Sequence, residues 1–177
     1  MIRYCFLLLY LMIGQYLPVT YTPILGKFSK WFRYQCCKRV FKKCGTNVTI
    51  EKGAKFGTGF GVELGDNSGI GVDCHIPSDI SIGNNVMMGP CCRIIAVNHC
   101  FERTDIPMNK QGSSEFKRTI IEDDVWIGAN VLIMPGKTIK KGSIIAGGCV
   151  LTKNFPEYSI IGGNPSKLIK SRLNIKI

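Results

Sequence analysis

Histidine is scarce in this chain, and its position is the first indication of chemistry. The 177 residues contain two histidines, His75 and His99. An imidazole with a pKa of about 6.5 exchanges a proton near neutral pH, so a histidine held in a fixed place is a candidate for acid–base catalysis. His99 opens a polar stretch with charges of both signs, HCFERTDIPMNKQGSSEFKR. A surface or loop-capping role is the alternative interpretation of His99, and His75 is interpreted as a surface residue.

This stretch interrupts a six-residue repeat, which must position it. The aliphatic residues at this spacing are Ile70, Ile76, Ile82, Met88 and Ile94, followed by Ile121, Ile127, Ile133, Ile139, Ile145 and Leu151. A helix would need a period of about 3.6 and a β-sandwich a period of two, so the six-residue period predicts an all-β solenoid of short strands. Neighbouring coils of a solenoid satisfy one another's backbone groups and share one aliphatic core.

The repeat breaks between Ile94 and Ile121, which are 27 positions apart, and 27 is not a multiple of six. We therefore expect an insertion at about residues 98–118 that leaves the coils as an excursion loop. Loops anchored on a rigid scaffold are favoured places for binding and catalysis. His99 stands at the root of this loop, where the coil would hold it while its imidazole faces whatever the loop encloses.

Positive charge is concentrated at the N-terminus. Residues 1–50 contain eight Lys or Arg and no Asp or Glu, and they account for +8 of the net charge of +11. The repeat region is therefore close to neutral, and its sequence lacks a basic platform with interleaved aromatic residues. Both observations argue against a nucleic-acid partner.

Residues 1–45 are expected to form a basic amphipathic helical segment ahead of the coils. Between Leu25 and Cys44, apolar residues fall three or four apart, with lysines and arginines around them. The apolar run Cys5–Ile13 is shorter than the ~18 residues that a membrane-spanning helix needs. One interpretation of the segment is a cap on the open end of the solenoid. The other is peripheral docking on an anionic membrane, which each nearby basic residue would favour by roughly 1 kcal/mol.

The cysteines indicate the compartment. The chain has nine, and several of them, including Cys74, Cys92 and Cys149, fall on inward positions of the repeat. The odd number and this placement are typical of small core residues in a reducing compartment. We therefore expect a cytoplasmic protein, held at the inner face of the membrane if the basic segment docks there.

Four segments of the repeat region resemble the hexapeptide-repeat acyltransferases. In chain order they read IGNNVMMGP, NHCFERTDIPMNKQG, IEDDVWIGANVLIMPG and IIAGGCVLTKNFPEYSIIGGNPSKLIK. The similarity is to the sugar O-acetyltransferases, both of the maltose and galactoside type and of the capsule and exopolysaccharide type. It implies a left-handed parallel β-helix over residues 46–177, with a tail at about 156–177 that contains a short C-terminal helix. It also implies a homotrimer with active sites between subunits.

The function implied by the resemblance is transfer of an acetyl group from acetyl-CoA to a saccharide hydroxyl, in the biosynthesis of surface polysaccharides. The acceptor would be free or lipid-linked, and no metal is required. His99 matches the general base of the family. The residues that the resemblance assigns to acceptor binding are Asn98, Asp105 and Met108. Those that it assigns to acetyl-CoA are Trp126 and Ala129 at the thiol end, Gly147, Thr152 and Lys153 along the pantetheine arm, and Lys167 and Lys170 at the nucleotide phosphates.

Other functions fit the sequence less well. A serine acetyltransferase-like enzyme for small metabolites shares the fold and the thioester chemistry, but usually has a large helical N-terminal domain, whereas about 45 residues precede the coils here. A non-catalytic structural solenoid would need neither the His99 loop nor the Trp126 coil. A zinc carbonic anhydrase of this fold needs three histidine ligands, and the chain has two.

Lys137 departs from the repeat. It occupies a fifth position of the hexapeptide, where the resembling family usually has a buried valine. We expect its ammonium group to reach out to solvent, or the coil to bulge around it.

Overall fold

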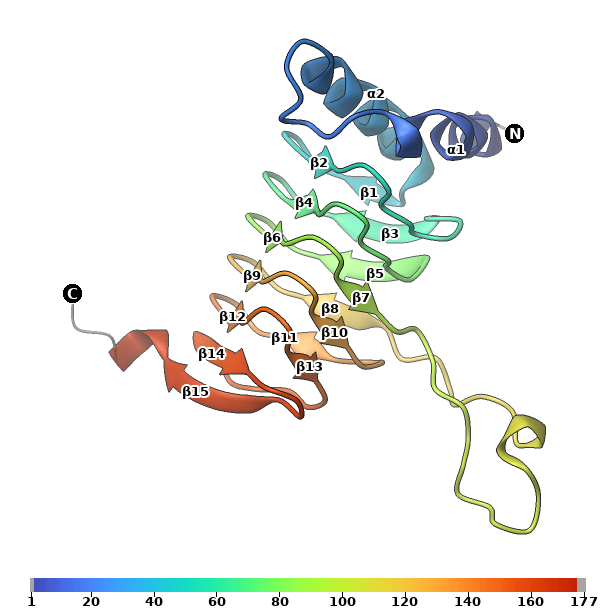
Figure 1. Ribbon diagram of the computed structural model, residues 1–177, viewed down its shortest axis with the longest axis vertical. Helices are drawn as coiled ribbons and strands as arrows, with labels where there is room; N and C mark the ends of the chain where they lie inside the picture. The colour runs from blue at the N-terminus through green and yellow to red at the C-terminus, as the bar shows by residue number, and fades with distance from the viewer. Residues whose placement is uncertain (1, 175–177) are drawn as a thin grey trace.

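A pair of helices covers one end of a stack of β-coils in the computed structural model, which describes residues 2–174 (Figure 1). The helices are α1 (Ile2–Met12) and α2 (Leu25–Val40), with the 3₁₀ turn η1 (Gly14–Tyr16) between them. The helix α2 ends four residues before Cys44. Phe41 adopts an extended conformation and Lys42 donates its N–H to the Val62 carbonyl at 2.9 Å, so this part of the chain already belongs to the first coil.

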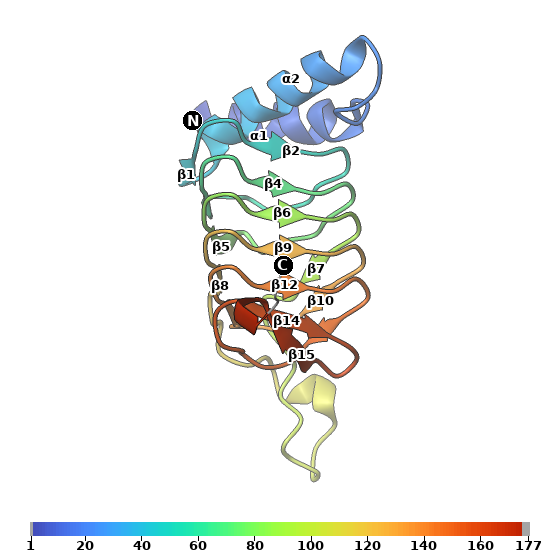
Figure 2. The same cartoon turned by 90° about the vertical axis from the view of Figure 1, so that its left-hand side faces the viewer.

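The coils have three faces of short strands, which are parallel except for β15. One face contains β1 (Lys43–Cys44), β3 (Gly61–Leu64), β5 (Asp79–Ile82), β8 (Thr119–Ile121) and β11 (Thr138–Ile139). A second face contains β2 (Thr49–Ile50), β4 (Gly69–Ile70), β6 (Met87–Met88), β9 (Trp126–Ile127), β12 (Ile144–Ile145), β14 (Ser159–Gly162) and β15 (Lys167–Ser171), most of them stacked like rungs in Figure 2. The third face contains β7 (Arg93–Ile94), β10 (Leu132–Ile133) and β13 (Val150–Leu151).

The register of the strands explains the six-residue period. Leu132 pairs with Val150, eighteen positions further along the chain, and Trp126 pairs with Ile144 at the same separation. Each coil therefore consists of three hexapeptides, one for each face. Residues at equal positions of successive coils lie directly above one another, and this stacking is why an aliphatic residue is needed at every sixth position.

The predicted inward residues form the core. Every aliphatic residue of the six-residue series, from Ile70 to Leu151, is at most 8% exposed, which confirms the interpretation of the repeat. Cys74, Cys92 and Cys149 are fully buried at fifth positions and act as small core side chains.

The C-terminal tail corrects one prediction. Instead of a short α-helix, the tail contains the strand β14 and then the strand β15, which runs antiparallel to β14, with Ile160 opposite Lys170. The helical part is the single 3₁₀ turn η3 (Arg172–Asn174), and residues 175–177 lie outside the described part of the chain. The outer edge of the last coil has backbone groups without a neighbouring coil, and β15 satisfies them by pairing.

The excursion loop leaves the stack after β7 and returns at β8. Figure 1 shows it projecting beyond the C-terminal coils, with the 3₁₀ turn η2 (Met108–Lys110) on its returning limb. The parallel pairing of β5 with β8 continues across the insertion, since Ser81 lies opposite Ile120. The solenoid therefore tolerates the loop without losing its register.

Candidate active site

The root of the loop is a short antiparallel ladder that holds His99. His99 lies opposite Ser113. On either side, Ser114 donates its N–H to the Asn98 carbonyl at 2.8 Å and Cys100 donates to the Gly112 carbonyl at 3.1 Å. The backbone of His99 is thus fixed by its neighbours while its side chain is exposed. This combination suits a residue that must meet a substrate in a defined position.

Beyond the root, the loop is held by its own polar contacts. The Arg103 guanidinium donates to the Asp105 carboxylate, and this hydrogen bond holds the pKa of the carboxyl below its usual range. The Gln111 amide donates to the carbonyls of Arg103 and Ile106 at 2.7 and 3.1 Å. Asp105 is therefore already partnered inside the loop, whereas Met108 in η2 is 63% exposed and available for contact.

A pocket of about 470 Å³ lies between the loop root and the coils. It brings together Asn98, predicted to bind the acceptor, and Thr152, predicted to bind the cofactor. They meet because β7, β10 and β13 end at the same corner of the solenoid, where Ile95 donates to the Ile133 carbonyl and Met134 donates to the Leu151 carbonyl.

Lys137 lines the same pocket, together with Lys117, and the sequence analysis did not assign it to the site. In the preceding coils of this face, Thr119 and Ile80 occupy the position that corresponds to Lys137. Both of these residues are buried, but Lys137 is half-buried. It belongs to β11's coil, the last one on that face, so its side chain can leave the core at the end of the stack. The lysine at a repeat position that is usually apolar was the sequence signal that could have predicted a positive charge at this pocket.

The predicted cofactor residues Trp126, Ala129 and Gly147 lie along another edge. Trp126 in β9 is half exposed. Behind it the coils approach closely: Gly148 donates to the Ala129 carbonyl at 2.9 Å, and a Cβ on Gly128 would come within 2.5 Å of the Gly147 nitrogen. Even a Cβ is excluded at Gly128, and the exposed Gly147 beside it has no side chain, so this edge of the coils is flat.

The remaining cofactor candidates fall into two places. Lys167 and Lys170 are exposed on β15, in the same sheet as Trp126. Thr152 and Lys153 follow β13 at the corner of the loop root. The Thr152 hydroxyl lies 3.2 Å from that of Ser166, and the Lys153 ammonium lies 5.5 Å from the centre of the Phe155 ring.

Within one chain, the predicted site residues therefore lie on two sides of the coil. Trp126 stands on the face formed by β6, β9 and β12, while the His99 loop leaves from the corner after β7. In a three-sided coil this corner lies opposite that face, with the buried aliphatic core between them. His99 and Trp126 of the same chain therefore lie on different sides of the coil.

The second histidine has a different environment. His75 is half-buried, and Arg93 donates to its Nδ1 at 3.1 Å. Burial, followed by the charges of Arg93 and Lys55, holds the pKa of His75 below its ordinary value. A neutral imidazole that accepts from an arginine fits a packing role on the outside of the coils. Within residues 2–174 we find no group of three or more His, Cys, Asp or Glu placed to hold a metal ion.

Comparison with known proteins places this geometry among acetyltransferases. Residues 118–153 match the family model described as bacterial transferase hexapeptide (six repeats). The chain is 31% identical over 150 residues to a galactoside O-acetyltransferase of Lactococcus lactis, an alignment that covers 77% of this chain and 66% of that protein. It is 32% identical over 138 residues to a putative acetyltransferase of Saccharomyces cerevisiae, covering 77% of this chain and 69% of the yeast protein.

The fold agrees with solved structures. A galactoside acetyltransferase in complex with coenzyme A superposes with a TM-score of 0.78 at 24% identity, covering 96% of this chain and 80% of the other. The curated relatives are longer than the part that aligns, since the chain spans about two thirds of the Lactococcus protein.

Proposed function

The chain belongs to the hexapeptide-repeat acetyltransferase family, and from this premise we propose that it transfers an acetyl group from acetyl-CoA to a saccharide hydroxyl. The observation that carries the proposal is His99, an exposed residue whose backbone is held by the ladder at the loop root, next to Asn98, which lines the pocket beside the coils. The naming of relatives as O-acetyltransferases supports the same chemistry. We further propose that the coils wind left-handed, as the resemblance implies.

His99 would act as the general base. Its neutral imidazole takes the proton of the saccharide hydroxyl while that oxygen attacks the thioester carbonyl. The tetrahedral intermediate then collapses, the bond from carbon to sulfur breaks, and the proton passes from the imidazolium to the departing thiolate. The products are the acetyl ester and free CoA, and acetyl transfer is direct. A backbone N–H of a flanking coil would stabilise the oxyanion.

The proposed site lies between subunits of a homotrimer. The separation of His99 and Trp126 on opposite sides of one chain supports this arrangement, because a second chain would bring its Trp126 face to the His99 corner of the first. Cyclic assemblies repeat such a heterologous contact around the ring, so a trimer would hold three equivalent sites.

The flat edge at Ala129 and Gly147 would bind the pantetheine arm of acetyl-CoA through backbone amides. Trp126 would lie beside the thiol end. Lys167 and Lys170 would meet the nucleotide phosphates as mobile point charges. The likeness to a structure that holds coenzyme A supports this use of the edge.

The acceptor would enter at the loop. We assign Asn98 and Met108 to contact with the saccharide, and Asp105 to an outer position, because its carboxylate is partnered by Arg103. The similarity of the loop sequence to capsule and exopolysaccharide enzymes favours a surface polysaccharide as the acceptor class.

The rate of CoA release from acetyl-CoA, measured with and without a panel of mono- and oligosaccharides, tests the proposal. We expect release to depend on a saccharide. Absence of release with every saccharide tested, but release with serine or another small metabolite, would replace the saccharide by that acceptor class. A solenoid without catalysis would release no CoA with any acceptor.

Replacement of Trp126 by alanine is expected to raise KM for acetyl-CoA about tenfold and to leave KM for the saccharide nearly unchanged, because the indole contributes apolar and stacking contact to the cofactor. Steady-state kinetics with each substrate varied in turn measure this split. Ile120→Ala, which removes a partly exposed apolar side chain from another face, is the control. Equal increases for both substrates would contradict a role on the cofactor side.

A further inference from the structure

The helix α1 is apolar on both its sides. Leu7 and Tyr10 face the first coil, where the Tyr10 hydroxyl donates to the Ala54 carbonyl at 2.7 Å. On the opposite side of the helix, Leu8 and Met12 are 60% and 68% exposed. A helix that served solely as a cap would carry polar residues on this outer side.

The helix α2 adds aromatic and basic residues to the same outer surface. Its inner side carries Arg33, which is fully buried. Its outer side carries Phe28 and Trp31, each about half exposed, with Lys27 and Lys38 beside them. The combination of aromatic rings and long basic side chains is typical of the level where a protein meets lipid headgroups.

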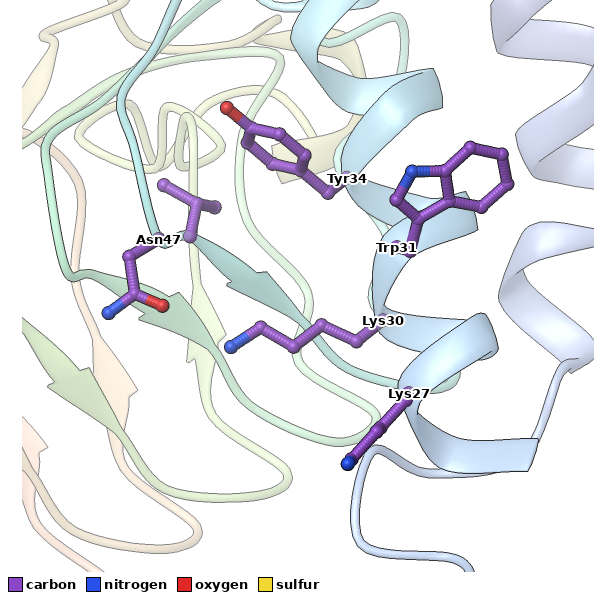
Figure 3. A pocket seen from close by; sticks show the side chains of 6 residues that line it. Lys27, Lys30, Trp31, Tyr34 and Asn47 are labelled. Carbon is purple, nitrogen blue, oxygen red and sulfur yellow. The ribbon is translucent and has the colours of Figure 1, made fainter. Parts of the chain in front are cut away.

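Trp31 lines both a groove and a pocket of this surface. It lines a mostly apolar groove between α1 and α2, together with Leu9 and Phe28. It also borders a pocket of about 240 Å³ between α2 and the first coil, and Lys27 and Lys30 line this pocket too. In Figure 3, both lysines leave α2 toward the side where Asn47 lies. Apolar space and positive charge thus lie side by side.

The charge of this region has one sign. Residues 1–50 hold eight basic and no acidic side chains. Glu51, which follows, lies 3.6 Å from the Arg33 guanidinium and accepts the Thr20 N–H, so it is turned inward. A partner of this surface must therefore be anionic, and it must also accept exposed Leu, Met, Phe and Trp side chains.

We propose that the outer face of the cap, formed by Leu8 and Met12 of α1 and by Lys27, Phe28, Trp31 and Lys38 of α2, docks on an anionic lipid bilayer. A bilayer offers an apolar interior directly below negative headgroups, which matches both properties of the face. The helices lie in the interface and do not cross it: α1 has 11 residues, about 16 Å, against a hydrocarbon core of about 30 Å. Within residues 2–174, no helix meets the length and hydrophobicity of a membrane span.

The docking fixes an orientation. The cap covers the end of the stack, so the coils stand on the membrane with the solenoid axis roughly perpendicular to it (Figure 1). Arg93, at the start of the segment that leads to His99, is two coil spacings from Lys55 of the first coil, or about 10 Å. If the proposed acetyl transfer holds, docking would raise the local concentration of enzyme around a saccharide that extends from a lipid of the same membrane.

Vesicle co-sedimentation of the full chain tests the contribution of the apolar side chains to membrane docking. We expect binding to vesicles of phosphatidylglycerol and phosphatidylcholine, and a decrease of at least tenfold in the partition coefficient for the double variant Leu8→Gln, Met12→Gln. The matched control Leu168→Gln, Leu173→Gln removes two exposed apolar side chains from the opposite end of the molecule and should bind like the wild type. Equal binding of the two double variants would overturn the assignment of the surface.

A second pair of double variants tests the electrostatic contribution to membrane docking. Lys27→Gln, Lys38→Gln should lower the partition coefficient by about 25-fold, from roughly fivefold for each charge, whereas Lys110→Gln, Lys141→Gln on the loop and a distant coil should not. Binding should weaken as salt shortens the Debye length from ~10 Å at 0.1 M to ~3 Å at 1 M. Equal binding to vesicles of pure phosphatidylcholine would contradict the role of charge.

A neighbouring subunit is the competing occupant of the face. If Leu8→Gln, Met12→Gln changes the oligomer mass in analytical ultracentrifugation and the wild type stays in the supernatant with vesicles, the surface is a subunit interface and the docking proposal is wrong. Because the vesicle assay requires no turnover, its outcome is independent of the outcome of the acetyl-transfer assay.

Discussion

Replacement of His99 by alanine is expected to lower kcat for acetyl transfer by ~10²- to 10⁴-fold, the range that general-base assistance supplies. The imidazole is exposed and its backbone is held by the ladder with Gly112–Ser114, so its loss removes a proton acceptor without opening the core. Initial rates of CoA release at saturating acetyl-CoA and saccharide measure the change.

His75→Ala is the matched control, since it removes the other histidine of the chain from its place beside Arg93. It should keep most of the activity. Far-UV circular dichroism and sedimentation should show both variants folded and assembled like the wild type. Near-full kcat for His99→Ala would show that another group takes the proton.

Replacement of Arg33 by methionine is expected to destabilise the cap by about 3 kcal/mol. The fully buried guanidinium donates to the carbonyls of Leu17, Pro18 and Ile50, and it lies 3.6 Å from the Glu51 carboxylate. Methionine fills a similar volume but leaves these acceptors without their donor. Burial lowers the pKa of the guanidinium, and the Glu51 carboxylate opposes part of that shift.

Urea unfolding measures this effect. The far-UV signal of the helices should be lost at a lower urea concentration than in the wild type and ahead of the signal of the coils, because each unit of a repeat protein contacts its neighbours alone. Arg39→Met, on the exposed side of the same helix, should change the stability by well under half as much. Equal effects of the two substitutions would contradict a structural role for the buried guanidinium.

The repeat could be read from the sequence because its cause is local and periodic. Ile127 and Ile145 lie in equal positions of successive coils, so the chain must place an aliphatic residue at each of them. The start of α2 could be placed for a similar reason, since the apolar residues of a helix recur every three or four positions.

The C-terminal strand could not be read in this way. The segment Lys167–Ser171 has little burial on either side, so it carries no pattern that distinguishes strand from helix. Its structure is decided by β14, whose free edge it pairs with. Long-range pairing of this kind depends on what the preceding coil leaves unsatisfied, and periodicity does not record that.

The sequence pointed to candidate site residues but not to how they are arranged. Asn98 and Thr152 share a pocket because three strands end at one corner, which depends on the number of residues in each coil. Lys137 was visible as an exception to the repeat, but its place beside Lys117 became clear once the loop and the last coil were seen together. The separation of His99 from Trp126 likewise follows from the three-sided coil.

Mass spectrometry of the acceptor tests the central claim most directly. The full chain is incubated with acetyl-CoA and a set of oligosaccharides, and each oligosaccharide is analysed for covalently added acetyl groups while free CoA is quantified in parallel. We predict an oligosaccharide that gains acetyl ester in equal amount to the CoA released, and no such product with His99→Ala. Consumption of acetyl-CoA without acetylation of any oligosaccharide, or no consumption with the whole set, would contradict saccharide O-acetyl transfer.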